Sequence, residues 1–442
     1  MFNQAMFAYS HGHEALFTQS IDGSESKYLC DHFSPIIALL SPLYVLFGSY
    51  ALLVIQIFFL LMGALFVYRL ALLKGYDLKW SLTFACLFLS IWGIYGSLSF
   101  DFHTNVIASS LLPVIVFYFF SKKWWQMSVV FLLALLCKEN SGILLFFLFL
   151  LLTITSDVER QLKRVSFLFA SLAALWVAIV LFFLMPAQCA GHLPNVEGFY
   201  HTFGNNFGEA FIQMIKSPLK VIRLFYEDTD GNLAKTKITT YWWLLLSGGV
   251  FVLLVPRFLV LIIPVLAQKF LSSNSLLWDI NGHYSMEFVP IIVLAAIALF
   301  QKRTNTKFGL VLLMVSVMLA LFMSWRGVIG RTAKSNIFKK EHFTSLFNRE
   351  DFGKVISYIP SDAVLSCTTP LAPHISDRRK VYLFPNYQKA EYVLLHKKGI
   401  ETYPMNVASF EEIKSKLLQD STMKIIHENG DFLLFQNMMP SQ

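Results

Sequence analysis

The sequence predicts an all-α polytopic membrane bundle followed by a small soluble α/β domain. Hydrophobic residues make up 56% of the 442 residues and charged residues only 14%, whereas soluble domains carry about 25% charged residues. Charged residues and prolines return, and long apolar runs end, after about residue 330. We therefore expect a multi-pass transmembrane domain at residues 1–330 and an α/β domain at residues 331–442.

The first 31 residues are polar and lack the charged-then-apolar pattern of a signal segment. The apolar run that follows from Phe33 is interrupted by Pro35, Pro42 and Gly48, so we interpret it as a re-entrant or interfacial half-helix. A polar segment needs an apolar helix to carry it across a membrane. Either the next helix does so, or the natural start lies upstream.

Ten apolar segments follow, and a full crossing needs about 20 residues. Because the segments beside Lys138 and Arg257 are short, each pair there is either two crossings or one long kinked helix. The segments are residues 50–73, 80–98, 106–120, 127–137, 143–154, 165–185, 241–255, 258–270, 286–300 and 308–325.

Basic residues predict the orientation of the bundle, because cytoplasmic loops are rich in Lys and Arg. If all ten segments are helices, the basic residues fall in five loops on one face, which we expect to be cytoplasmic. The net charge of +8 then reflects membrane anchors and not a nucleic-acid partner. The outer face receives the N-terminal segment, Asp101, Lys138, the loop 186–240, His283 and the C-terminal domain.

The loop 186–240 contains an amphipathic stretch near residues 211–225. This stretch is either a flap over a groove or, as we favour, a helix on the membrane surface. The C-terminal domain alternates strand-like runs with a helix-like one, which indicates a small α/β or α+β module. The runs are AVLSC, VYLF, YVLL and DFLLF for strands and FEEIKSKLLQ for the helix.

Two aspartate–histidine pairs lie at outer membrane edges, Asp31 with His32 in CDHFSP and Asp101 with His103 in FDFHTN. Either aspartate is equally well explained as a helix cap. The repetition of the pattern favours one shared pocket instead. Since a carboxylate can deprotonate an acceptor hydroxyl, we predict Asp31 and Asp101 as catalytic residues.

Lys138 and Glu139 interrupt an apolar stretch, where an ionisable group costs several kcal/mol unless it is paired or hydrated. An ion pair between them is one explanation. Adjacent helical side chains point apart, however, so we expect other partners, such as Asp101 or a phosphate for Lys138. A further pair, His283 and Tyr284, completes the predicted cluster of polar residues at the outer face. The predicted donor- or substrate-binding residues are His32, His103, Lys138, Glu139, His283 and Tyr284.

No metal site is predicted. The neighbouring residues His11, His13 and Glu14 in HGHE have no further ligand spaced away from them along the chain. The five cysteines form no CxxC pair. We assign no cofactor and leave a divalent cation open. Phosphate-loop, HExxH, GxSxG and kinase signatures are absent from the sequence.

Several runs resemble a bacterial family of multi-pass membrane proteins, a domain of unknown function related to the GT-C glycosyltransferases. They include FNQAMFAYSHG, FDFHTNVIASSLLPVIVFYFF, LLCKENSGILL, NGHYSMEFVP and, in the tail, PSDAVLSCTTPLAPHISDRRKVYLFP. Members carry a transmembrane helix and an acidic residue ahead of the stretch that matches residues 2–4. This sequence lacks that helix and that acid, so the resemblance implies either a truncated chain or one without transferase activity, with Asp31 and Asp101 as the remaining acids.

The resemblance implies a GT-C-like bundle in the inner (plasma) membrane with an extracytoplasmic C-terminal domain. Its partners would be membrane lipid and a lipid-linked sugar donor, a polyprenyl phosphate whose sugar is transferred on the outer face. The alternatives are a transporter or flippase of lipid-linked material, or a non-catalytic membrane assembly protein. Charges gathered at one face favour catalysis, and charges spread through both membrane halves favour transport.

Overall fold

The computed structural model describes residues 1–155, 158–189, 199–301, 306–330, 336, 338–398 and 402–440. The chain divides into two compact units. The helical unit comprises His32–Ile36 and Leu53–His342, and the sheet unit comprises Met1–Asp31, Ile37–Leu52 and Phe343–Gln442. The polar N-terminal segment thus packs with the C-terminal domain, a grouping that the sequence did not indicate.

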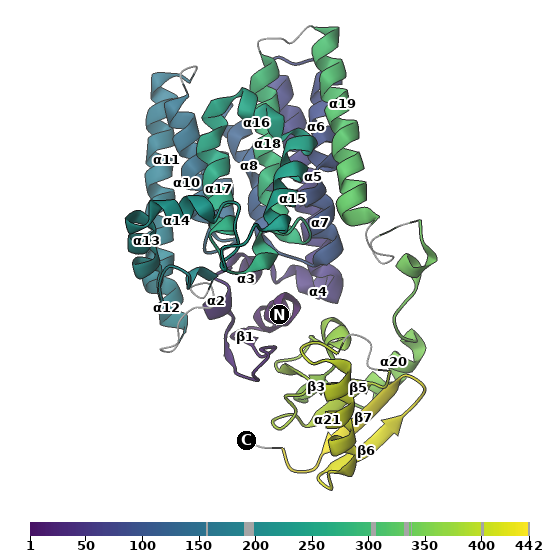
Figure 1. Ribbon diagram of the computed structural model, residues 1–442. Coiled ribbons are helices and arrows are strands. Elements are labelled where there is room, and N and C mark those ends of the chain that lie inside the picture. Colours follow the sequence, from purple (N-terminus) through teal and green to yellow (C-terminus); the bar gives the residue numbers. More distant parts are fainter. Residues whose placement is uncertain are drawn as a thin grey trace. The chain divides into compact units, whose positions relative to one another are not determined.

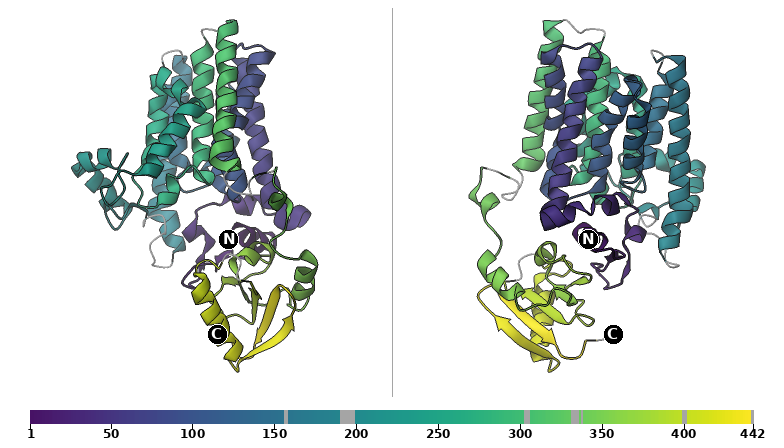
Figure 2. Two further views of the ribbon diagram at one scale, coloured as in Figure 1. Left: turned by 45° about the vertical axis from the view of Figure 1, so that its right-hand side comes forward. Right: turned by 180° about the vertical axis from the view of Figure 1, so that it is seen from behind.

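The helical unit is a bundle of long helices, seen from three directions in Figures 1 and 2. Helices occupy all ten apolar segments, which confirms the predicted all-α bundle. They are α5 (Ala51–Leu73), α6 (Leu78–Ser90), α7 (Trp92–Phe100), α8 (Thr104–Phe120), α9 (Trp124–Leu135), α10 (Ser141–Ile154), α11 (Arg160–Ile179), α15 (Lys235–Leu244), α16 (Val250–Leu254), α17 (Leu259–Phe270), α18 (Phe288–Phe300) and α19 (Lys307–Ser324).

Fewer of these helices are of spanning length than the sequence suggested. Within the described residues, five helices are long and apolar enough to cross a membrane, or six if α6 and α7, bent by 45°, form one span. Helices α8, α9 and α10 have only 17, 12 and 14 residues. At about 1.5 Å per residue, α9 and α10 are shorter than the hydrocarbon core. The short segments beside Lys138, left open from the sequence as two crossings or one kinked helix, are thus two short helices, α9 and α10.

Large apolar side chains on the outer helices are exposed. Phe167 and Phe183, at α11 and its continuation, are 64% and 69% exposed, and Phe308 and Met318 on α19 are 72% and 67% exposed. Helix α18, by contrast, is almost entirely buried. Exposed apolar surface on this scale requires an apolar solvent, so α11 and α19 have the character of lipid-facing helices and α18 of a central one.

The amphipathic stretch forms two short helices, α13 (Phe207–Lys216) and α14 (Pro218–Arg223). Their apolar residues Phe211, Ile215 and Leu219 are 65% exposed or more. Exposed apolar side chains suit a helix on the membrane surface, the reading that we favoured from the sequence.

The sheet unit is built on a five-stranded sheet of order β4-β3-β5-β7-β6. Strands β4, β3 and β5 are parallel, and β7 and β6 run antiparallel to their neighbours. The four predicted strands and the predicted helix are confirmed, while β6 and α20 were missed. The elements are α20 (Arg349–Ile356), β3 (Leu365–Cys367), β4 (Val381–Leu383), β5 (Tyr392–His396), α21 (Val407–Gln419), β6 (Met423–Glu428) and β7 (Phe432–Asn437).

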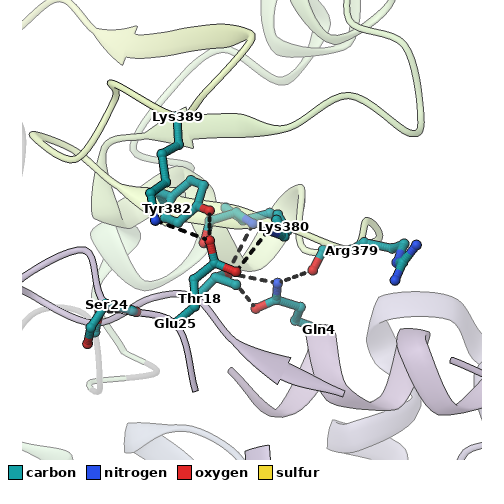
Figure 3. A network of polar contacts seen from close by, with 10 residues as sticks. Gln4, Thr18, Ser24, Glu25, Arg379, Lys380, Tyr382 and Lys389 are labelled. Atoms are coloured by element: carbon teal, nitrogen blue, oxygen red, sulfur yellow. Dashed lines mark hydrogen bonds and ion pairs between the residues drawn. The ribbon is translucent and has the colours of Figure 1, made fainter. Parts of the chain in front are cut away.

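The N-terminal segment covers the open edge of this sheet (Figure 3). Thr18 pairs with edge strand β4 twice: its hydroxyl donates to the Val381 carbonyl at 2.8 Å and accepts from the Val381 N–H at 3.2 Å. Gln4 donates to the Arg379 carbonyl at 2.8 Å. An uncovered edge strand invites pairing with another chain, so the segment protects the edge. It contains α1 (Phe2–Ser10), β1 (Leu16–Phe17), β2 (Ser26–Lys27) and α2 (Tyr28–Asp31).

A candidate polar site at one end of the helical unit

Two cavities mark opposite ends of the helical unit. Helices α8 and α10 line both cavities, while the segment η7 (His283–Glu287) lines one and α18, which follows it directly, lines the other. Helix α8 lines one with Asn105 near its start and the other with Phe120 at its end. The predicted site residues of the helical unit lie at the end that contains Asn105, which we name the polar end. Its cavity is lined by Asn105, Ser109, Asn140, Ser141, Gln268 and Glu287, besides apolar residues.

His103 and His283 stack on each other at the polar end. Their ring centroids are 3.3 Å apart and their planes differ by 9°. The backbone around each ring is held by polar contacts: the His103 N–H donates to Gln56 Oε1 at 3.0 Å, and Asn105 Nδ2 donates to the His283 carbonyl at 3.3 Å. The structure thus brings together two histidines that lie 180 residues apart in the sequence.

Lys138 and Glu139 face each other loosely in the turn between α9 and α10. Lys138 Nζ lies 3.8 Å from Glu139 Oε1, beyond hydrogen-bond distance, and both side chains are at least 90% buried. We expected adjacent side chains to diverge, which holds only on a helix. Residues 136–140 lie outside the helices instead, and the two side chains converge. No ion pair joins Lys138 to Asp101 in the part of the chain that the structure describes.

A second buried ion pair was missed by the sequence analysis. Lys269 Nζ, at the end of α17, lies 2.7 Å from Glu287 Oε2, and the two side chains are 4% and 9% exposed. The signal was present, because Lys269 is the one charged residue in the run LVLIIPVLAQKF. A buried charge in such a run needs a partner, and Glu287 stands four residues after the predicted site residue His283.

Tyr284 lies between the two lysines. Its ring centroid is 5.6 Å from Lys138 Nζ and 5.5 Å from Lys269 Nζ, and 3.9 Å from the ring of His283. Distances below about 6 Å are those of cation–π contacts. Two ammonium groups from separate segments therefore converge around one phenol.

Several buried polar atoms at this end have no hydrogen-bond partner among the described residues. They include both ring nitrogens of His283, Glu139 Oε2 and three atoms of the polar cavity wall, Asn105 Oδ1, Ser109 Oγ and Ser141 Oγ. Buried polar groups without partners are rare and costly in native proteins. These atoms can bind hydroxyls or other polar groups of a ligand.

The two predicted catalytic aspartates have different surroundings. Asp101 ends α7 at the polar end, where its exposed carboxylate accepts a hydrogen bond from the Phe102 N–H at 2.7 Å. The helix-cap alternative is wrong for Asp101, because α8 begins after His103 without a side-chain cap hydrogen bond and, among the described residues, the Asp101 carboxylate bonds only its neighbour's N–H. Asp31 is buried as the last residue of α2 in the sheet unit. Its membership of one shared pocket stays a prediction.

The charges at the polar end act on His103. Burial, and then the positive charge of Lys138, lowers its pKa to about 3, and His32 acts in the same direction. His103 is therefore neutral at physiological pH and can donate or accept one hydrogen bond at each ring nitrogen.

The described residues contain no group of three or more His, Cys, Asp or Glu side chains placed to hold a metal ion. The chemistry available at the polar end is that of two ammonium groups, three carboxylates and imidazoles in a mostly buried setting. Such a setting can stabilise a developing negative charge and transfer a proton.

The family comparison agrees with a membrane protein. The family model described as "Predicted membrane protein (DUF2079)" matches residues 1–427. No curated protein matches the chain. Among solved structures, the chain is similar to the crystal structure of ArnT from Cupriavidus metallidurans bound to undecaprenyl phosphate, with 9% identity, a TM-score of 0.48, and coverage of 100% of this chain and 94% of that one. Since the family match spans almost the whole sequence, the chain belongs to the DUF2079 family of predicted membrane proteins.

Proposed function

We propose that this protein is a GT-C-type membrane glycosyltransferase that takes a sugar from a polyprenyl-phosphate donor on the extracytoplasmic side. The observation that carries the proposal is the convergence of Lys138 and Lys269 on the Tyr284 ring, at 5.6 Å and 5.5 Å. Paired ammonium groups suit a phosphate that gains negative charge as its bond to the sugar breaks. The apolar walls of the bundle suit the polyprenyl chain.

In the proposed reaction, an acceptor hydroxyl attacks the anomeric carbon of the donor sugar. The bond between that carbon and the phosphate oxygen breaks, and the polyprenyl phosphate leaves with both bonding electrons. Lys138 stabilises the leaving phosphate, together with Lys269. The hydroxyl proton passes to a carboxylate, for which Asp101 and Asp31 are the candidates carried over from the family resemblance.

The sugar would lie at the polar cavity and the histidine stack. Asn105, Ser109 and Ser141 present unpartnered polar atoms in the cavity wall, and His283 presents two ring nitrogens. Such groups can hydrogen-bond sugar hydroxyls. We therefore assign His32, His103, Glu139, His283 and Tyr284 to substrate contacts.

The test is the Lys138→Ala variant, assayed by release of polyprenyl phosphate from a panel of polyprenyl-phosphate sugars in membranes. This readout needs no knowledge of the acceptor. We expect release to fall at least a hundredfold, about the loss seen when one stabilising donor is removed. The control is Lys79→Ala, because Lys79 is exposed and lies away from the polar end. Normal release by the inserted Lys138→Ala variant would remove the phosphate-site assignment.

We also infer that the polar end faces the extracytoplasmic side of the inner membrane. The support is the distribution of basic residues: Lys74, Lys122 and Arg257 lie in connections at the other end of the bundle. Single cysteines at Lys123 and Asn281, in a chain without its free thiols, should label from opposite sides with an impermeant reagent. Labelling of both from one side would contradict this orientation.

A transporter or flippase is the second candidate, and broken helices favour it. Helices α6 and α7 meet at 45° near Ile91, and the path from α15 to α16 is kinked at Ser247 and Gly248, where Gly248 has φ +107°. Transport predicts movement of a lipid-linked sugar across proteoliposomes without release of polyprenyl phosphate. The donor-release assay therefore separates the two functions.

A further inference from the structure

A second cavity lies at the end of the helical unit opposite the polar end. It contains about 700 Å³ of space between protein atoms, counting its open mouth. It is formed by α5, α8, α10 and α18, by residues that follow α5, α10 and α18, and by the connection between α16 and α17. Its inner wall is apolar and buried, with Val116, Leu148 and Leu294 among the lining residues.

Among the described residues that line this cavity, the two charged ones are both cations. Lys74 follows directly after α5, and Arg257 lies between α16 and α17. Lys74 Nζ is 3.0 Å from the centroid of the Phe120 ring, which closes the end of α8. Lys74 and Arg257 are partly exposed, as is Thr155, so the polar side chains surround the mouth and the apolar ones the interior.

The two cations are close enough to influence each other. Burial, and then the neighbouring charge of Arg257, lowers the pKa of Lys74 to about 8. An anion placed between the two side chains would relieve this repulsion. The cavity therefore combines an anion-attracting mouth with an apolar interior.

We propose that this cavity is a binding site for an anionic phospholipid, with the phosphate between Lys74 and Arg257 and an acyl chain among α5, α8, α10 and α18. A phospholipid is an anion joined to apolar chains. It therefore matches a cavity with cations at its mouth and apolar residues in its interior. Basic pockets between transmembrane helices on the cytoplasmic side recognise anionic head groups. The site is separate from the polar end and requires no glycosyltransferase activity.

The test uses the purified full chain in detergent, titrated with phosphatidylglycerol and monitored by native mass spectrometry. We expect one tightly retained phosphatidylglycerol, and weaker retention of zwitterionic phosphatidylcholine. Removing both cations in Lys74→Gln/Arg257→Gln should weaken binding by at least twentyfold, roughly fivefold for each charge near the membrane surface. The matched control is Lys79→Gln/Lys307→Gln, which removes two exposed cations that do not line the cavity.

A second variant tests the apolar part. Ala298→Phe fills the interior and leaves both cations in place, so it should also abolish retention. Unchanged retention in Ala298→Phe would mean that the surface charge alone attracts the lipid, and would overturn the site. Equal binding of the two lipids, or unchanged binding in the double-cation variant, would overturn it as well. If the double-cation variant fails to fold, Lys74→Gln alone and Ala298→Phe decide the question.

Discussion

The imidazole rings of His103 and His283 lie face to face, with centroids 3.3 Å apart, although each comes from a different connection of the bundle. Both rings also contact Phe100, at 5.4 Å and 5.5 Å. Two protonated imidazoles cannot occupy such a stack, because like charges at this distance repel strongly. The polar end is therefore built for neutral histidines.

The first prediction concerns pH. Burial and the charge of Lys138 lower the pKa of His103 from 6.5 to about 3. Because the folded-state pKa is lower than the unfolded one, the free energy of unfolding is highest above pH 6.5 and falls as the pH drops toward 3. The melting temperature of the purified protein should decrease over this interval. His103→Phe keeps a ring but cannot titrate, so its melting temperature should fall less steeply; an identical slope would contradict the assignment.

The second prediction concerns the buried pair of Lys269 and Glu287. Replacing either partner alone, as Lys269→Met or Glu287→Gln, should lower the free energy of unfolding by about 3–5 kcal/mol, because an uncompensated buried charge or a broken contact remains. Replacing both by apolar residues should recover most of the loss. The surface pair Lys122 and Glu159, more than half exposed, provides the control, with an expected effect of about 0–1 kcal/mol. Denaturant titrations in detergent measure the free energy of unfolding of each variant. Equal losses at the buried pair and at the surface pair would contradict the prediction.

The third prediction concerns the close approach of α7 to η7. A Cβ added at Gly93 would lie 2.5 Å from the Ser285 carbonyl oxygen, and one at Gly96 would lie 2.7 Å from that of Gly282. Backbone atoms cannot move aside cheaply, so Gly93→Ala should destabilise the protein by about 1–3 kcal/mol and displace His283. Gly353→Ala is the control, because open space surrounds that helical glycine. A Gly93→Ala variant with wild-type melting temperature and donor release would show that α7 packs differently.

The fourth prediction concerns Glu25 and the docking of the N-terminal segment in the sheet unit (Figure 3). Glu25 pairs with Lys380 at 2.8 Å and accepts a hydrogen bond from Tyr382. Burial alone would raise the pKa of Glu25, but the hydrogen bonds and charges of Lys380, Tyr382 and Lys389 bring it below 4.5. The stabilisation is thus present above pH 4.5 and is lost as the pH falls through the lowered value.

At neutral pH, Glu25→Gln should imitate this loss. Amide hydrogen exchange should rise in residues 16–27 and in edge strand β4, because the covering segment is held less firmly. Glu14→Gln removes an exposed pair with Lys27 and should leave the exchange of β4 unchanged. Protection of β4 that is identical in Glu25→Gln and in the wild type would show that Thr18 and Gln4 suffice for docking.

The sequence by itself determined the class of the protein and the positions of its helices. Long apolar runs such as the one containing α5 can fold only as helices in lipid, since every backbone polar group must be bonded internally. In the tail, alternating apolar runs indicated β3, β4, β5 and β7. Strand β6 was not predicted, because it is an edge strand with a polar sequence, MKIIHE, and is largely exposed.

The tertiary structure decided which polar residues meet. Local spacing holds no information on contacts between distant segments, so the stack of His103 on His283 and the pair of Lys269 with Glu287 could not be read from it. The rule that adjacent side chains point apart applies only to helices, so it did not hold for Lys138 and Glu139, which lie between two helices. The sequence also could not show that the N-terminal segment packs on the sheet. The hydrogen bonds involved go to backbone groups of the edge strand, and every residue carries such groups.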